Sequence, residues 1–197
     1  GRATYTADVR LPGTLVGKIL GSPVAHGLVR RVDATKARAL PGVLAVITGA
    51  DVPDTWYGVS PAREDEQILA KDRVRYVGDE IAAVAAVDEE TAERALALIE
   101  LDIEELPAVF DAEAALTPGA PLIHPERARY ANNVNTRVDW HFGDVDAGFA
   151  GADLVREQRF VGNRTYQAPI EPHAALARWE PHGNRLTMWS STQTPHY

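Results

Sequence analysis

The sequence contains no cysteine among its 197 residues. This absence excludes disulfide bonds, zinc held by thiolates and cysteine nucleophiles from the chain. It also excludes cysteine-ligated iron–sulfur clusters, so any such cluster must be bound by another polypeptide. Because a protein without cysteine suits either redox environment, the absence does not identify a compartment.

The chain also lacks a basic surplus, since 28 acidic residues outnumber 20 lysines and arginines and give a formal net charge of −8. Nucleic acids and anionic membranes bind basic surfaces, so we expect neither as a partner. No apolar run of about 18 residues and no basic-then-apolar N-terminal stretch occurs, so no membrane span or signal peptide is visible. We therefore expect a cytoplasmic protein.

Apolar residues make up 45% of the chain, which is ample for a packed core, and the length fits one large domain or two small ones. The first hundred residues mix strand-like and helix-like patterns. Asp33 can cap a short helix at 34–39, because its carboxylate can accept the first free amides. Strands are predicted at residues 14–20, 28–32, 43–47 and 101–105.

The clearest pattern of this first part lies between residues 74 and 99. Strand-like segments at 74–77 and 81–87 flank Gly78-Asp79, which predicts a β-hairpin. The second segment is apolar throughout, as in a strand that is buried on both faces. Asp88 then caps a helix with Thr91 at its third position, and one face of this helix is apolar: Ala92, Ala95, Leu96 and Ile99. We expect a compact α+β unit of about 105 residues.

The composition changes after residue 106, where prolines at 107, 118, 121 and 125 indicate a connector with a short helix at 111–116. The second unit is predicted to be mostly β, with a helical turn at 145–150 and a tight turn at 182–184. Its expected strands are residues 133–142, 154–161, 174–180 and 185–190. Because it is small and has open edges, and ends on a polar run at 190–193, we expect more protein to follow it.

Motifs for self-contained chemistry are missing. The sequence has no glycine-rich phosphate loop and no Gly-x-Ser-x-Gly elbow, and its six histidines are scattered. We therefore expect no catalytic residue and no metal ligand from this chain alone.

The segment around Glu171 and His173 is the most site-like part of the sequence. At strand spacing these two side chains point to the same side of the chain. They could be a surface pair beside a stiff bend, or Glu171 could be a carboxylate held near a cofactor or a subunit contact. The amides of Gln167 and Gln193 could donate hydrogen bonds to an oxo or phosphate group, or could simply be solvated.

Short motifs along nearly the whole chain carry a family resemblance. They are Pro12-Gly13, GSPVAH at 21–26, ALPGV at 39–43, VRYVGD at 74–79 with IAAVAA at 81–86, EELPAV at 104–109, GDVD at 143–146, EPHAA at 171–175 and STQ at 191–193. Each motif is weak by itself, but they occur in the right order. The sequence resembles the N-terminal part of the large, molybdenum-carrying subunit of the molybdenum hydroxylases, the xanthine dehydrogenase, aldehyde oxidase and carbon monoxide dehydrogenase superfamily.

The resemblance implies an α+β fold: an α/β hammerhead domain at residues 1–112, a linker at 113–132 and the first segment of a molybdopterin-binding domain at 133–197. In the family that domain continues for several hundred residues and includes a glycine-rich loop beside the molybdenum and a late catalytic glutamate. Neither is present here. We therefore expect the isolated chain to be inactive, either as a truncated piece, as a natural short subunit, or with the rest on another polypeptide.

The resemblance also implies a function in the complete enzyme, namely oxidoreduction of an aromatic or heteroaromatic substrate. The cofactor is expected to be molybdopterin, in its cytosine dinucleotide form, with iron–sulfur clusters and FAD on partner subunits of an oligomeric complex. Gln167 and Glu171 are expected at the edge of the cofactor pocket, with His173 supporting that strand. Tyr57 to Ala62 and Asp65-Glu66 favour the 4-hydroxybenzoyl-CoA reductase branch, and a xanthine dehydrogenase-like enzyme stays open.

A different class of function is a non-catalytic scaffold or subunit-interaction module. The open strand edges expected at residues 133–197 motivate this alternative, which predicts association through that segment.

Overall fold

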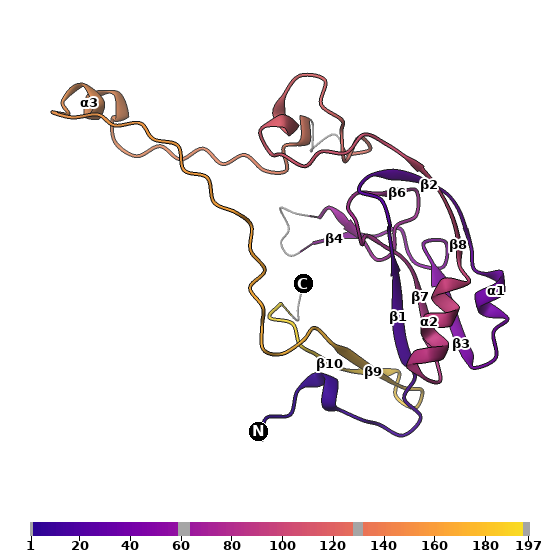
Figure 1. The fold of residues 1–197 in the computed structure, drawn as a ribbon. Helices are drawn as coiled ribbons and strands as arrows, with labels where there is room; N and C mark the ends of the chain where they lie inside the picture. Colours follow the sequence, from indigo (N-terminus) through magenta and orange to yellow (C-terminus); the bar gives the residue numbers. More distant parts are fainter. Residues whose placement is uncertain (1, 59–63, 128–131, 195–197) are drawn as a thin grey trace. The chain divides into compact units, whose positions relative to one another are not determined.

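The computed structural model describes residues 2–58, 64–127 and 132–194 (Figure 1). The described chain forms two compact units, the larger from residues 10–136 and the smaller from residues 2–9 together with 137–193. Among these described residues, no helix is long and apolar enough to cross a lipid bilayer.

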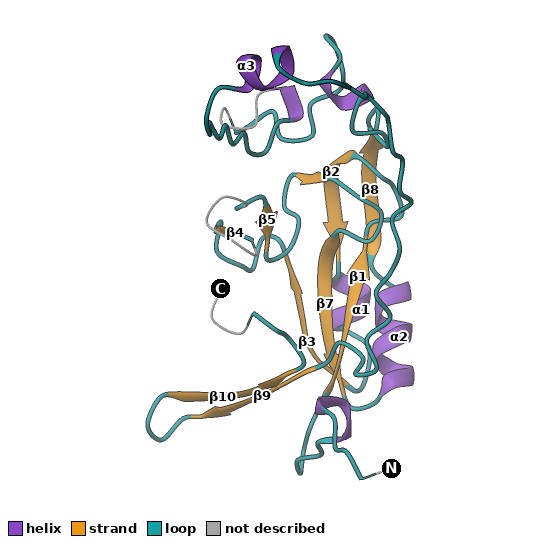
Figure 2. Cartoon of the chain, turned by 90° about the vertical axis from the view of Figure 1, so that its left-hand side faces the viewer, coloured by secondary structure: helices purple, strands orange, loops and turns teal. Residues whose placement is uncertain are grey.

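The larger unit contains a three-stranded antiparallel sheet in the order β1-β7-β3 (Val16–Gly21, Glu80–Ala86 and Val43–Thr48). Strand β7 lies in the middle and pairs with both neighbours, so that Ala83 faces Ile19 on one side and Ile47 on the other. Helices α1 (Thr35–Arg38) and α2 (Glu89–Ala97) pack on this sheet (Figure 2). The expected burial of this strand is confirmed along most of its length, because Ile81, Ala82 and Ala86 are fully buried.

The predicted apolar face of α2 is confirmed. Asp88 caps the helix by accepting a hydrogen bond from the Thr91 amide at 2.8 Å, and Ala92 and Ala95 are fully buried against the sheet. The first helix is shorter than expected and has Ala34 rather than Asp33 at its N-cap position. The Asp33 carboxylate nevertheless accepts the first free amide, that of Thr35, at 2.9 Å.

A second antiparallel sheet has the order β6-β2-β8 (Arg73–Val74, Gly27–Asp33 and Glu100–Glu105). The predicted hairpin at 74–87 is therefore wrong, since β6 pairs with β2 whereas β7 pairs with β1 and β3. The turn itself exists, because Gly78 has a φ of 94° and the Asp79 amide donates to the Tyr76 carbonyl. The chain changes sheets there: Val74 belongs to the second sheet and Ile81 to the first, and both are fully buried in one cluster with side chains of β2 and β8.

The crossing from β6 to β7 runs against the end of β1 at close range. The Ser22 amide donates to the Asp79 carbonyl, and the Gly78 amide donates to the Ser22 carbonyl, both at 2.8 Å. A Cβ on Gly21 would lie 2.8 Å from the Gly78 Cα, which is too close for any side chain. Glycine at position 21 is thus required by the meeting of these two backbones.

The connector after β8 folds back on the larger unit instead of running free. It contains a short 3₁₀ turn, η2 (Ala114–Leu116), where a longer helix was expected. The Asn133 amide donates to the carbonyls of Ala115 and Pro121 at 3.1 and 2.9 Å and accepts from the Ile123 amide at 3.0 Å. One side chain therefore closes most of the described part of this segment into a loop.

The smaller unit contains a 3₁₀ turn, a helix and one hairpin: η1 (Thr6–Asp8), α3 (Val145–Ala150), β9 (Ala175–Glu180) and β10 (Arg185–Ser190). The two strands pair in register, with Leu176 opposite Trp189, and the expected turn at 182–184 is confirmed by the positive φ of Gly183 and Asn184. The strands expected at 133–142 and 154–161 are wrong. A segment with strand-like composition forms a strand only where a neighbour can pair with it, and no described residue pairs with these two segments.

Candidate functional site

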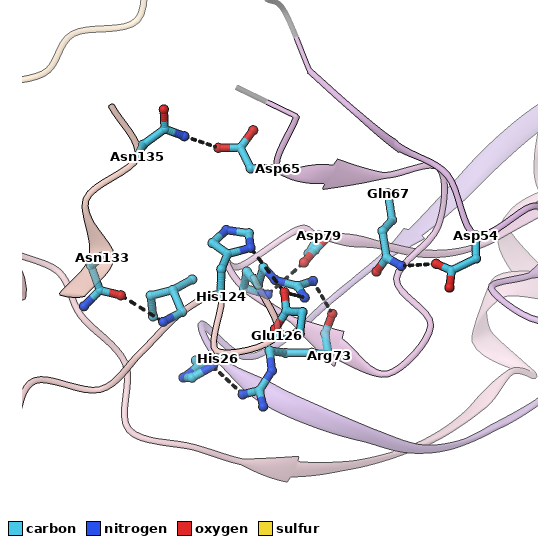
Figure 3. A network of polar contacts seen from close by, with 12 residues as sticks. His26, Asp54, Asp65, Gln67, Arg73, Asp79, His124, Glu126, Asn133 and Asn135 are labelled. Atoms are coloured by element: carbon cyan, nitrogen blue, oxygen red, sulfur yellow. Dashed lines mark hydrogen bonds and ion pairs between the residues drawn. The ribbon is translucent and has the colours of Figure 1, made fainter. Parts of the chain in front are cut away.

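The larger unit has a cleft of about 650 Å³ that is lined mainly by charged and polar residues. Figure 3 shows the network of polar contacts in this region. A two-residue ribbon borders the cleft, formed by β4 (Trp56–Tyr57) and β5 (Glu66–Gln67). The guanidinium groups of Arg75 and Arg127 both contact the Trp56 ring, and their central carbons are 5.0 and 4.7 Å from the ring centroid. Such cation–π contacts hold the ribbon and the connector together.

Arg75 is the centre of this cluster, with only 10% of its side chain exposed. It donates to Glu126 at 2.8 Å and to the Arg73 carbonyl at 3.1 Å. Burial, and next the charge of Arg75, lowers the pKa of His124, so its imidazole is neutral at neutral pH. The connector is therefore attached to the larger unit by an ion pair and by ring contacts.

His26, next to this cleft, is a buried structural histidine. Its Nδ1 lies 2.7 Å from the Pro107 carbonyl, which can only accept, so the proton is on Nδ1. Its Nε2 then accepts from the Arg73 guanidinium at 2.9 Å. The ring links the start of β2, β6 and the chain after β8, and both of its nitrogens are used.

The charges around the cleft are balanced, with three arginines (Arg73, Arg75, Arg127) and three acids (Asp54, Asp72, Glu126) in its lining. In the described ranges, no group of three or more His, Asp or Glu side chains could hold a metal ion. Among the described residues that line the cleft, none is a nucleophile paired with a base. Its contacts stabilise the fold of the larger unit, and we assign it no chemistry.

Asp79 is the carboxylate whose titration the structure perturbs most clearly in this region. It accepts a hydrogen bond from the Arg75 amide at 2.7 Å, yet burial raises its pKa from 3.8 to about 6. Because the pKa is higher in the folded chain than in the unfolded chain, folding favours the protonated form. This group therefore lowers stability as the pH rises from about 4 to about 6.

We predict that Asp79→Asn, which retains an oxygen acceptor, stabilises the chain at pH 8 by about 1 kcal/mol, allowing for partial solvent exposure. The difference from the unsubstituted chain should vanish near pH 4, where the aspartate is protonated in both states. Urea denaturation at the two pH values measures this, with the exposed Asp153→Asn as the control. If Asp79→Asn gains no stability over the parent chain when the pH is raised from 4 to 8, the raised pKa of Asp79 is contradicted.

The residues expected at a cofactor pocket all lie in the smaller unit. Gln167 is exposed in an irregular segment and makes no side-chain hydrogen bond to the described residues. Glu171 is half-buried, and its Oε1 accepts a hydrogen bond from the Thr6 amide at 2.9 Å. His173 is exposed. No hydrogen bond or ion pair among the described residues joins these three side chains, so the structure does not assemble them into one cluster.

Ser191, one residue past β10, organises this region. Its Oγ accepts from the Ala174 amide at 2.7 Å and lies 3.0 Å from the Pro172 carbonyl, to which it can donate. The Ser191 amide also donates to the Ala174 carbonyl at 3.1 Å. The start of β9 and the end of β10 are thus fixed to each other, and Gln193 follows this anchor by two residues.

Sequence reasoning placed Ser191 in a motif but gave it no role, and it missed Thr6 entirely. A serine just beyond a predicted hairpin is a usable signal, because a hydroxyl there can bond to the backbone of the partner strand. The contact between Thr6 and Glu171 has no local signal, since 165 residues separate the two positions.

Two family models match consecutive parts of the chain. Residues 1–107 match the model described as "Aldehyde oxidase and xanthine dehydrogenase, a/b hammerhead domain", and residues 123–197 match the "Molybdopterin cofactor-binding domain".

Curated relatives match over the full chain. The carbon monoxide dehydrogenase large chain of Afipia carboxidovorans is 35% identical over 100% of this chain and 26% of its own length. The nicotine 6-hydroxylase large subunit of Paenarthrobacter nicotinovorans is 35% identical over 100% of this chain and 24% of its own length. The nicotinate dehydrogenase large molybdopterin subunit of Eubacterium barkeri is 35% identical over 100% of this chain and 45% of its own length. The chain spans about a quarter of the length of the first two.

Solved structures agree with these matches. Quinoline 2-oxidoreductase from Pseudomonas putida 86 superposes with a TM-score of 0.82 at 35% identity, over 96% of this chain and 24% of the other. Cu,Mo-CO dehydrogenase superposes with a TM-score of 0.80 at 32% identity, over 98% of this chain and 26% of the other. The chain therefore belongs to the aldehyde oxidase and xanthine dehydrogenase family of molybdenum-dependent oxidoreductases, and it comprises a hammerhead domain and the start of a molybdopterin-binding domain.

Proposed function

We propose that the chain is part of the large subunit of a molybdenum hydroxylase that oxidises or reduces an aromatic or heteroaromatic substrate. The observation that carries this proposal is the pair of consecutive family matches, at residues 1–107 and 123–197. The names of three relatives, nicotine 6-hydroxylase, nicotinate dehydrogenase and quinoline 2-oxidoreductase, support a nitrogen heteroaromatic as the substrate class.

The residues of the smaller unit fit a cofactor that is bound through hydrogen bonds. In molybdopterin the metal is held by the dithiolene of the organic ligand, so the protein needs donors and acceptors more than metal ligands. The chain offers the amides of Gln167 and Gln193 and the carboxylate of Glu171 for this purpose. When bound, the cofactor supplies the two-electron redox chemistry, and the protein supplies orientation and electrostatics.

We place Gln167 and Glu171 at the edge of the cofactor pocket, and we add Gln193 as a hydrogen-bond donor. Gln193 is supported by its position, two residues after the Ser191 anchor, where the backbone is held by the start of β9. A donor on a fixed backbone stabilises developing charge without reorganising during the reaction. Gln167 has no comparable anchor, and we expect it to contribute less.

The remaining parts of the proposal concern organisation. We propose domain boundaries at 1–112, 113–132 and 133–197, a cytosine dinucleotide form of the cofactor, partner subunits that carry iron–sulfur clusters and FAD, and a cytoplasmic complex. The 4-hydroxybenzoyl-CoA reductase branch stays a prediction, as does the xanthine dehydrogenase-like alternative. Part of the stretch that favours the former, residues 59–63, lies outside the described residues.

The proposal is tested by purifying the complete enzyme from its host and assaying reduction of an artificial electron acceptor. A panel of nicotinate, quinoline, hypoxanthine and an aliphatic aldehyde separates the substrate classes. We expect turnover with a heteroaromatic compound and loss of activity after cyanide treatment or in hosts starved of molybdate. Turnover that persists without molybdate contradicts the proposal.

The scaffold alternative is supported by one observation on the hairpin. Trp179, Leu186 and Met188 lie on the same face of the β9–β10 hairpin and are each more than half exposed. An apolar face of this kind promotes association. If this is the role of the chain, deleting residues 133–197 should convert an oligomer into a monomer, and a deletion variant that still associates excludes it.

A further inference from the structure

The N-terminal segment belongs to the smaller unit, although more than a hundred residues separate it from the rest of that unit in the sequence. Its turn η1 is closed by a reciprocal pair of bonds: the Tyr5 amide donates to the Asp8 carboxylate, and the Asp8 amide donates to the Tyr5 carbonyl, both at 2.9 Å. This turn also packs on β9. We call residues 5–8 the N-terminal clasp.

The clasp presents one amide that its own turn cannot satisfy. Amides in the first turn of a helical segment have no partner within that turn, and the Thr6 amide is one of these. Glu171 accepts it at 2.9 Å from the far end of the chain. A carboxylate that accepts a backbone N–H forms a charge-assisted bond, and the half-buried position of Glu171 limits competition from water.

The segment from Glu171 to Ala174 is therefore held at two points. The clasp binds it at Glu171, and Ser191 binds it at Pro172 and Ala174. Gln167 precedes this segment, whereas Gln193 follows the Ser191 anchor. The two proposed pocket glutamines therefore flank the anchored stretch in sequence: Gln167 lies four residues before Glu171, and Gln193 lies two residues after Ser191.

We propose that Glu171 is a positioning residue whose carboxylate fastens the N-terminal clasp to the 171–174 segment and so fixes the proposed edge of the cofactor pocket. This role rests on the proposed function only for its effect on catalysis. The fastening itself is a property of the smaller unit. The positioning role needs only a hydrogen-bond acceptor at residue 171. A direct contact between Glu171 and the cofactor or substrate would instead need its negative charge.

The test compares Glu171→Gln with Glu171→Ala in the complete enzyme, with Glu157→Ala, an exposed glutamate of the same unit, as the control. A glutamine oxygen still accepts the Thr6 amide, whereas alanine removes the acceptor. We expect amide hydrogen exchange of residues 6–9 to speed up about tenfold to a hundredfold in Glu171→Ala and to stay within about threefold in Glu171→Gln. The control should behave as the parent enzyme.

Kinetics of the same variants provide the second readout. We expect Glu171→Ala to lower kcat with little change in KM, and Glu171→Gln to restore kcat. If Glu171→Gln loses activity as fully as Glu171→Ala while exchange stays slow, the charge acts directly and the positioning role is wrong. Unchanged exchange in Glu171→Ala excludes the clasp. Because exchange needs no turnover, an enzyme without molybdenum activity would overturn the proposed function and leave the clasp to be judged separately.

Discussion

Alanine in place of Gln193 is expected to lower kcat of the complete enzyme about 100-fold to 1000-fold, the cost of losing one preorganised donor at a developing charge. The reason is geometric. Ser191 fixes the backbone just before Gln193 through bonds of 2.7 Å to the Ala174 amide and 3.1 Å to its carbonyl. The anchor limits the positions that the Gln193 backbone can adopt, and the cofactor would order the exposed side-chain amide when it binds.

Gln167→Ala is the matched comparison. Both glutamines are exposed, but Gln167 has no backbone anchor like that of Ser191 close to it, so we expect a loss of only about tenfold. Molybdenum content and the thermal transition should be measured for both variants, so that loss of cofactor or of fold is separated from loss of rate. A larger effect at Gln167 than at Gln193 would place the pocket donor on the irregular segment and refute the argument from anchoring.

Gly21→Ala is expected to destabilise the larger unit by about 2–4 kcal/mol, the range of overpacked sites with close backbone contact. The added Cβ would lie 2.8 Å from the Gly78 Cα and 2.9 Å from its carbonyl oxygen. Neither atom can turn away, because Ser22 and Gly78 are joined by a 2.8 Å backbone hydrogen bond. The substitution must therefore separate the end of β1 from the crossing between the sheets.

Gly17→Ala in the same strand is the control for this substitution. No atom lies within 4 Å of the Cβ that it would add, so we expect it to be neutral or to stabilise by about 0.5 kcal/mol through the unfolded chain. Urea denaturation of both variants measures the difference. Equal effects of the two substitutions would show that the contact with Gly78 relaxes at no cost.

Local patterns in the sequence were sufficient for elements whose signals are complete within a few residues. Asp88, Thr91 and the apolar face that follows them specify α2 by capping and periodicity, and both features are present in the structure. The β9–β10 hairpin could be predicted equally well from the sequence, because Gly183 and Asn184 define its turn.

Pairing between strands could not be inferred in the same way. The segments around Gly78 carry every local signal of a hairpin, yet their partners lie in two different sheets. The choice depends on the burial of Val74 and Ile81 in one cluster with side chains of β2 and β8, which is a tertiary effect. Segment 133–142 has the alternation of a strand and segment 154–161 has apolar pairs at its two ends, but neither has a partner among the described residues.

In the candidate site too, the sequence indicated the local segment but not its long-range contacts. The sequence singled out the segment around Glu171 by the spacing of Glu171 and His173 and by the family resemblance, and its place at a cofactor pocket stays a prediction. What Glu171 contacts depended on Thr6, at the other end of the chain, and no pattern in either segment announces that bond. Family resemblance supplied the cofactor class, whereas the geometry identified Ser191 as the residue that anchors the start of β9 to the end of β10.

The most direct test of the account is the molybdenum content of the native protein that carries this chain, measured together with its intact mass. The account predicts about one molybdenum atom per polypeptide containing residues 1–197, together with a pterin released on denaturation. The metal should remain through gel filtration in the same fractions as the polypeptide. A pure, folded native protein that contains this sequence and binds neither molybdenum nor a pterin would contradict the central claim.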